Sequence, residues 1–127
     1  MMKYCLSIAS LVLTMATASA QAERHIYVAD HEVRLVLKMK EDGTVLWKAE
    51  NNNGHDVQVL ENGNVLVNCP PSVREYGPDG KIVWEAGKEV AADPESAQRL
   101  RNGNTLIADN ARHRVIEIDT DKNVVWT

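Results

Sequence analysis

Phenylalanine is absent from the 127-residue sequence, and its six aromatic side chains are three tryptophans and three tyrosines. Cysteine is scarce too, and of the two cysteines Cys5 lies in the N-terminal leader. Cys69 is then the only thiol of the mature chain, so no internal disulfide can form and stability must come from packing. Beyond the leader no stretch approaches the roughly 20 apolar residues of a membrane helix, so no membrane span is predicted.

An excess of positive charge is also missing. The net charge is −4 with 25% charged residues, which argues against a nucleic-acid partner. The sequence contains no Gly-x-Ser-x-Gly, phosphate-binding loop, Cys-x-x-Cys, His-Glu-x-x-His or dinucleotide-binding motif, so no cofactor is predicted. Asp119–Asn123 resembles the start of a calcium loop, but Val124 stands where that loop needs glycine, so no metal site is predicted.

The first twenty residues have the pattern of a secretory signal peptide. A short basic start, Met1–Lys3, precedes the uncharged apolar run Leu6–Met15, and Ala18–Ala20 supplies the small residues before a cleavage point. We therefore expect cleavage after Ala20 and a secreted or periplasmic protein that comprises residues 21–127.

The rest of the chain repeats itself three times, over residues 21–50, 51–88 and 89–127. Each repeat ends in a turn and a short apolar segment with tryptophan, and these tryptophans are Trp47, Trp84 and Trp126. A second block, Leu-x-Asn-Gly-Asn, recurs at Leu60–Asn64 and Leu100–Asn104 and contains the pairs Asn62-Gly63 and Asn102-Gly103. We interpret the tryptophans as packing residues between neighbouring repeats, with a stacking platform for a ligand as the alternative.

Short strands joined by tight turns are predicted for every repeat. Val57–Leu60 and Val65–Val67 flank an Asn-Gly pair, which predicts a hairpin with a type I′ turn and positive φ at both central residues. Ile116 and Ile118 alternate with Val115, Glu117 and Asp119, which is the period of two expected of a half-buried strand. We therefore predict an all-β fold of four antiparallel strands per unit, with a short helical turn around Glu89–Ala97 as the one exception.

With these motifs in view, the chain resembles the six-bladed β-propeller repeats of bacterial exported proteins, in their NHL-like, PQQ-like and arylsulfotransferase-like forms. The resemblance rests on Gln98–Asp109, His113–Asp119 and His55–Asn64 and covers residues 23–127. It implies about two and a half blades, the first of which begins at its second strand. Such a partial propeller would be closed by further blades after Thr127 or by assembly, and we expect self-association through the open blade edges.

Two functions are compatible with this resemblance. The leading hypothesis is a non-catalytic binding or scaffolding module with a small molecule or a protein as its partner. The alternative is an arylsulfotransferase-like enzyme, in which the resemblance implies a channel histidine that accepts the sulfuryl group. His55 is the one histidine at a matching place, since the third repeat has Glu95 there. Transfer of this kind also needs several groups that stabilise the developing oxyanion.

The candidate ligand-binding residues fall into two groups, each with a structural alternative. At the start of inner strands, His55, Asp56, Gln58 and Gln98 would either line a channel or form hydrogen bonds between repeats. In a connection between strands, where binding loops are common, the arginines could hold an anion or belong to a solvated loop. This second group consists of Asp109, Asn110, Arg112, His113 and Arg114. Cys69 is interpreted as a small buried residue rather than a nucleophile.

Overall fold

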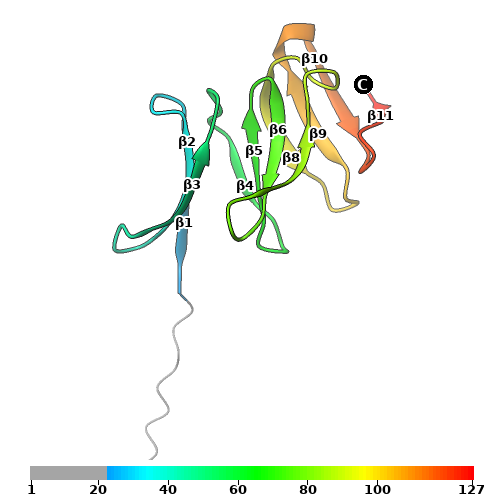
Figure 1. Ribbon diagram of the computed structural model, residues 1–127. Coiled ribbons are helices and arrows are strands. Elements are labelled where there is room, and N and C mark those ends of the chain that lie inside the picture. Colours follow the sequence, from blue (N-terminus) through cyan, green and yellow to red (C-terminus); the bar gives the residue numbers. More distant parts are fainter. Residues whose placement is uncertain (1–22) are drawn as a thin grey trace, which may run out of the picture.

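The computed structural model describes residues 23–127, which form three antiparallel β-sheets placed side by side in chain order (Figure 1). The all-β prediction is confirmed. The first sheet contains β1 (His25–Asp30), β2 (Leu35–Lys40) and β3 (Val45–Glu50). The second contains β4 (Val57–Val59), β5 (Val65–Cys69), β6 (Ser72–Tyr76) and β7 (Ile82–Ala86). The third contains β8 (Pro94–Arg99), β9 (Thr105–Asp109), β10 (Arg114–Ile118) and β11 (Val124–Trp126).

Each sheet is a simple meander in which every strand pairs with the next one along the chain. The short turn predicted around Glu89–Ala97 is confined to the start of that range, where the N–H groups of Val90 and Ala91 donate to Gly87 O at 2.9 and 3.2 Å, because β8 begins at Pro94. A single 3-10 turn, η1 (Asn110–Arg112), lies between β9 and β10. No helix in the described part of the chain is long and apolar enough to cross a membrane. The predicted signal peptide, residues 1–20, lies outside the described residues.

The Asn-Gly hairpins form as predicted, but the turn type differs. In the second sheet the N–H of Gly63 donates to Leu60 O at 2.9 Å, and Gly63 has φ +83°. Asn62 is not among the residues with positive φ, so the predicted type I′ turn is wrong. The arrangement is a type I turn followed by one left-handed residue, which is the usual three-residue hairpin loop. Asn62 instead accepts a hydrogen bond from the N–H of Asn64 at 3.0 Å, which fixes the turn.

The core lies between the sheets and divides into two clusters. Val36 of the first sheet packs with Val65, Val67 and Tyr76 of the second. The opposite face of the second sheet contributes Leu66 and Val73 to a cluster with the third sheet. Because successive residues of a strand point to opposite faces, β5 can supply both clusters at once. The third sheet's share of the second cluster consists of Ala97, Ile107, Ile116 and Ile118.

The three repeated tryptophans have different surroundings. Trp47 of the first sheet stacks on Tyr76 of the second with ring centroids 5.9 Å apart. Trp84 of the second sheet lies under the guanidinium of Arg99 from the third, with Cζ 4.8 Å from the ring centroid. Trp126, on the outermost strand of the third sheet, is 56% exposed. The first two tryptophans therefore contact the following sheet, whereas residues 23–127 form no further sheet that covers Trp126.

Candidate functional site

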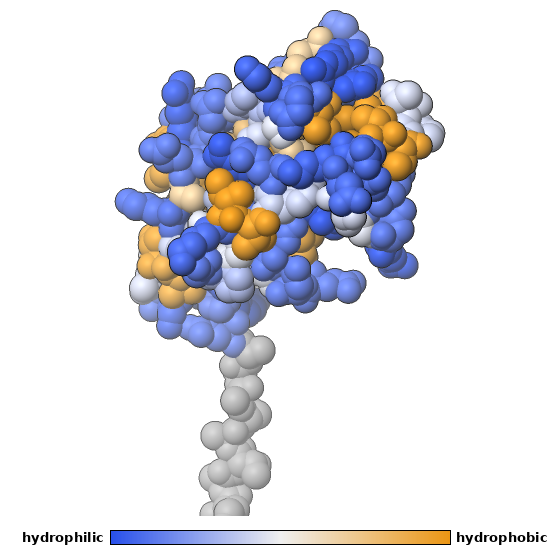
Figure 2. Space-filling model, turned by 45° about the vertical axis from the view of Figure 1, so that its right-hand side comes forward, coloured by the Kyte–Doolittle hydropathy of each residue, from blue (hydrophilic) through white to orange (hydrophobic). Residues whose placement is uncertain are grey.

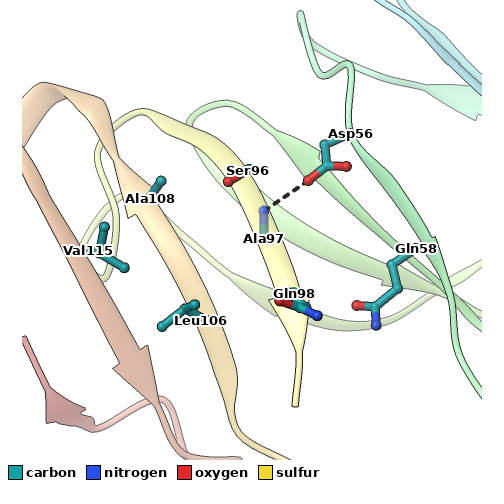
Figure 3. Close-up of a pocket in the computed structure, with 8 residues that line it drawn as sticks. All are labelled: Asp56, Gln58, Ser96, Ala97, Gln98, Leu106, Ala108 and Val115. Carbon is teal, nitrogen blue, oxygen red and sulfur yellow. Dashed lines mark hydrogen bonds between the residues drawn. The ribbon is translucent and has the colours of Figure 1, made fainter.

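A pocket of about 450 Å³ lies where β4 approaches the outer face of the third sheet (Figure 3). Its polar wall comes from the start of the second sheet and from β8, and its apolar floor comes from β9 and β10. Three of the four residues that we predicted at the start of inner strands line it. The lining residues are Asp56, Gln58, Ser96, Ala97, Gln98, Leu106, Ala108 and Val115.

The segment that leads into β4 is held in place by the buried side chain of Asn68 on β5. Asn68 Oδ1 accepts hydrogen bonds from the N–H groups of His55, at 3.0 Å, and Asp56, at 2.7 Å. Gly54 precedes this pair and approaches the Asn68 carbonyl so closely that a Cβ would stand 1.6 Å from its oxygen. Only glycine fits there, so the position of His55 and Asp56 follows from this close backbone approach.

Asp56 and Gln58 reach from the second sheet to the free edge of β8 in the third. Gln58 Oε1 accepts from the N–H of Arg99 at 2.7 Å, and Gln58 Nε2 donates to Arg99 O at 3.3 Å. Asp56 Oδ2 accepts from the N–H of Ala97 at 3.3 Å, as the dashed line in Figure 3 marks. These side chains satisfy edge groups of β8 that would otherwise lack partners in the sheet. They therefore contribute both to the pocket wall and to the contact between sheets.

His55 stands beside the pocket with its side chain 55% exposed. Its Nε2 lies 3.7 Å from Glu95 Oε2, and Glu95 is itself exposed. A carboxylate next to an attacking imidazole opposes the build-up of negative charge on a transferring sulfuryl group, because such a transition state needs cations or hydrogen-bond donors. The charged neighbour of the His55 imidazole is therefore a carboxylate at the surface.

Gln98 occupies the same repeat position as Gln58, one sheet further along. It is exposed, and its side chain forms no hydrogen bond with another residue in the part of the chain that the structure describes. Figure 3 places it on β8, between Gln58 and the strand that carries Leu106. Gln98 therefore presents an amide to solvent at the place where Gln58 binds the next sheet.

The second group of candidates surrounds Asp109, whose side chain is fully buried at the end of β9. Asp109 Oδ1 accepts from the N–H groups of Ala92, at 3.1 Å, and Asp93, at 3.2 Å. Its Oδ2 accepts from Arg112 Nη1 at 3.1 Å and from Arg114 Nε at 3.4 Å. Burial alone would raise the pKa of this carboxyl, but the backbone donor and the two arginines outweigh it and lower the pKa.

Both arginines also donate to the carbonyl oxygen of Val90, Arg112 from Nη1 at 3.0 Å and Arg114 from Nη2 at 2.9 Å. Arg112 Nη2 further donates to Lys88 O at 3.2 Å. These contacts join η1 and β10 to the segment that precedes β8. Much of the donor capacity of the two guanidinium groups is therefore used within the chain, and an anion would have to bind beside these contacts.

The remaining two candidates lie on the surface of the same connection. Asn110 Nδ2 donates to Asp93 Oδ2 at 3.1 Å, and His113 is exposed and left-handed, with φ +49°. Both line a shallower pocket of about 310 Å³ together with Asp109 and Arg114. Glu95, Ala108 and Val115 line it too, and the last two also line the pocket of Figure 3. The two predicted groups therefore flank one continuous face of the third sheet.

Sequence reasoning missed Asn68, Ser96 and Glu117. A signal for Asn68 was present, because the repeat positions that correspond to it hold Ala29 and Ala108, and a polar residue at a small apolar position calls for an explanation. Within residues 23–127, no three His, Cys, Asp or Glu side chains are grouped so that they could hold a metal ion.

Comparison with known proteins gives a likeness of fold alone. No protein-family model matches the chain, and no curated protein matches it. Among solved structures it is similar to the crystal structure of a protein of unknown function from Bacteroides caccae, with 19% sequence identity and a TM-score of 0.63. The match covers 80% of this chain and 44% of that chain, so this chain spans less than half of that structure's length.

Proposed function

We propose that this chain forms consecutive blades of an exported β-propeller and acts as a non-catalytic binding module. The observation that carries the proposal is the repeated docking of inner strands: β4 packs beside β1, and β8 packs beside β5. The second and third sheets thus each place their first strand against the preceding sheet. Propeller blades are arranged in this manner around a common axis, and the first strands of the blades line it.

The pocket in Figure 3 supports a binding role. It lies at the inner strands, its wall is polar and its floor is apolar, which is the usual composition of a recognition site. The environment of His55 supports the absence of catalysis, because its charged neighbour is a carboxylate. An arylsulfotransferase-like enzyme would instead need cationic groups around that histidine.

An assay with an aryl sulfate donor tests this proposal directly. We expect the purified chain, incubated with 4-nitrophenyl sulfate and a phenolic acceptor, to release nitrophenol no faster than buffer does. The His55→Ala variant serves as the matched control and is expected to give the same background rate. Release that exceeds the background and disappears in His55→Ala would establish the enzyme and overturn the non-catalytic proposal.

A further inference from the structure

The outer face of the third sheet repeats the face of the second sheet that the third sheet covers. On the second sheet Leu66, Val73 and Glu75 are buried, whereas on the third sheet Val115 is 43% exposed and Leu106 is half-buried. The repeat and the strand registers pair the residues one to one. The pairs are Gln58 with Gln98, Leu66 with Leu106, Val73 with Val115, and Glu75 with Glu117.

Arg99 on β8 shows what this kind of face binds. Its backbone N–H and C=O are both held by the Gln58 side chain, at 2.7 and 3.3 Å. Its guanidinium Nη2 donates to Glu75 Oε2 at 2.9 Å, and Glu75 is 6% exposed. Ala97, two residues earlier on the same strand, packs into the apolar cluster that contains Leu66 and Val73. The second sheet therefore binds an extended strand with the sequence pattern small residue, any residue, arginine, which here is Ala97-Gln98-Arg99.

The third sheet presents the same groups, and no segment of residues 23–127 occupies them. Glu117 Oε1 accepts from Asn104 Nδ2 at 2.6 Å, just as Glu75 Oε1 accepts from Asn64 Nδ2 at 2.6 Å. In Glu75 the other oxygen, Oε2, accepts a hydrogen bond from Arg99. The Oε2 of Glu117 has no such partner among residues 23–127. The Gln98 amide is exposed, and the apolar floor of the pocket contains Leu106 and Val115. In Figure 2, which brings this side of the molecule forward, orange apolar patches lie among blue polar side chains.

We infer that this face is a docking site for an extended strand of another polypeptide that carries the pattern small residue, any residue, arginine. The arginine would pair with Glu117, its backbone would bind the Gln98 amide, and the small residue would lie on Leu106 and Val115. The inference deepens the proposed binding function, on which it rests, by naming the class of partner. Recognition of this kind combines backbone hydrogen bonds with side-chain pockets.

A second copy of this chain does not fit the site as well. Its own Ala97–Arg99 segment is already held between β9 and Gln58. Its second sheet has Val59 at the repeat position of Arg99, so that sheet offers no cation. Its first sheet consists of β1, β2 and β3 and has no strand in the place of β8. The charge of Glu117 therefore favours a different polypeptide.

The probe for this site is a fluorescein-labelled, acetylated peptide with the sequence of residues 93–100, Asp-Pro-Glu-Ser-Ala-Gln-Arg-Leu. We expect its fluorescence anisotropy to rise on titration with the full chain. Glu117→Gln keeps the hydrogen bond from Asn104 and removes the charge, so it should weaken binding about tenfold. A peptide with alanine in place of arginine should lose affinity by a similar factor, whereas the exposed control Glu61→Gln should bind like the wild type.

Several outcomes would overturn the inference. No binding by the wild-type chain is one, and binding that Glu117→Gln leaves unchanged is another, because the peptide would then occupy a different place. A homodimer in sedimentation that Glu117→Gln dissociates would assign the face to a second copy instead. Circular dichroism checks that the variant is folded. Peptide binding and aryl sulfate turnover are independent measurements, so failure of the inference is distinguishable from failure of the non-catalytic proposal.

Discussion

Replacement of Asp109 by alanine is expected to lower the free energy of unfolding by about 2–4 kcal/mol. The substitution removes an acceptor from two backbone N–H groups, those of Ala92 and Asp93, and from two guanidinium groups. Arg112 and Arg114 keep partial contact with water, with side chains 38% and 31% exposed, so the loss stays below that of a fully buried ion pair. Urea unfolding followed by tryptophan fluorescence measures the change.

Asp30 is the matched control for this substitution, because it holds the same repeat position at the end of β1. Its Oδ1 accepts from the N–H groups of Glu32, at 2.9 Å, and Val33, at 3.1 Å, in an exposed turn. Water can replace these bonds, so Asp30→Ala should cost only about 0.5–1 kcal/mol. Equal losses for the two variants would contradict the role assigned to burial and to the arginines.

The lowered pKa of Asp109 also predicts how stability depends on pH. A carboxyl whose pKa is lower in the folded state than in the unfolded chain binds fewer protons when folded. Its contribution is therefore complete above the unfolded value, near 3.9, and is lost as the pH falls through the lower folded value. We expect the stability difference between wild type and Asp109→Asn to shrink between about pH 5 and pH 2. A difference that stays constant over this range would show that the charge of Asp109 does not contribute.

Much of the fold could be predicted from the sequence repeats and from the period-two pattern of apolar residues. The recurring Asn-Gly turns and the alternation over residues 115–119 predict hairpins, and hairpins in series give the three meanders. The turn type could not be read in the same way, because Asn-Gly suits both a type I′ turn and a type I turn with a left-handed glycine. Hydrogen bonds of the flanking strands decide between the two, and these depend on register.

The site was less predictable because its contacts join distant segments. Gln58 was proposed either to line a channel or to bind between repeats, and its bonds to Arg99 span 41 residues. The sequence places Glu117 on a strand but does not show that it lacks an ionic partner. That becomes visible only in the structure, where the corresponding residue Glu75 pairs with Arg99. From the sequence, the arginines of the Asp109 connection could either hold an anion or belong to a solvated loop, whereas the structure directs several of their donors to Val90 and Asp109. Residue type alone does not reveal which donors are already used.

Replacement of Asn68 by alanine should cost about 3–4 kcal/mol in the free energy of unfolding. Its Oδ1 accepts from the N–H groups of His55 and Asp56, and its Nδ2 donates to the carbonyl oxygens of Pro94, at 3.2 Å, and Glu95, at 2.8 Å. One buried amide thus joins the start of β4 to the start of β8. Alanine would leave these four backbone groups without their partner around a side chain that is itself buried, with Asn68 1% exposed.

Two further variants separate the halves of this role. Asn68→Asp keeps the acceptor for His55 and Asp56 but places a carboxylate against two carbonyl oxygens. At pH 7 we therefore expect a loss of stability close to that of alanine. Stability should partly recover at lower pH as the carboxyl is protonated. Asn62→Ala removes a single exposed turn contact and should cost no more than about 1 kcal/mol. If Asn68→Ala proved as mild as Asn62→Ala, the bonds from Asn68 could not be what joins the second sheet to the third. The bonds from Asp56 and Gln58 to β8, together with the packing of Leu66 and Val73 against the isoleucines of the third sheet, would then have to hold the two sheets together.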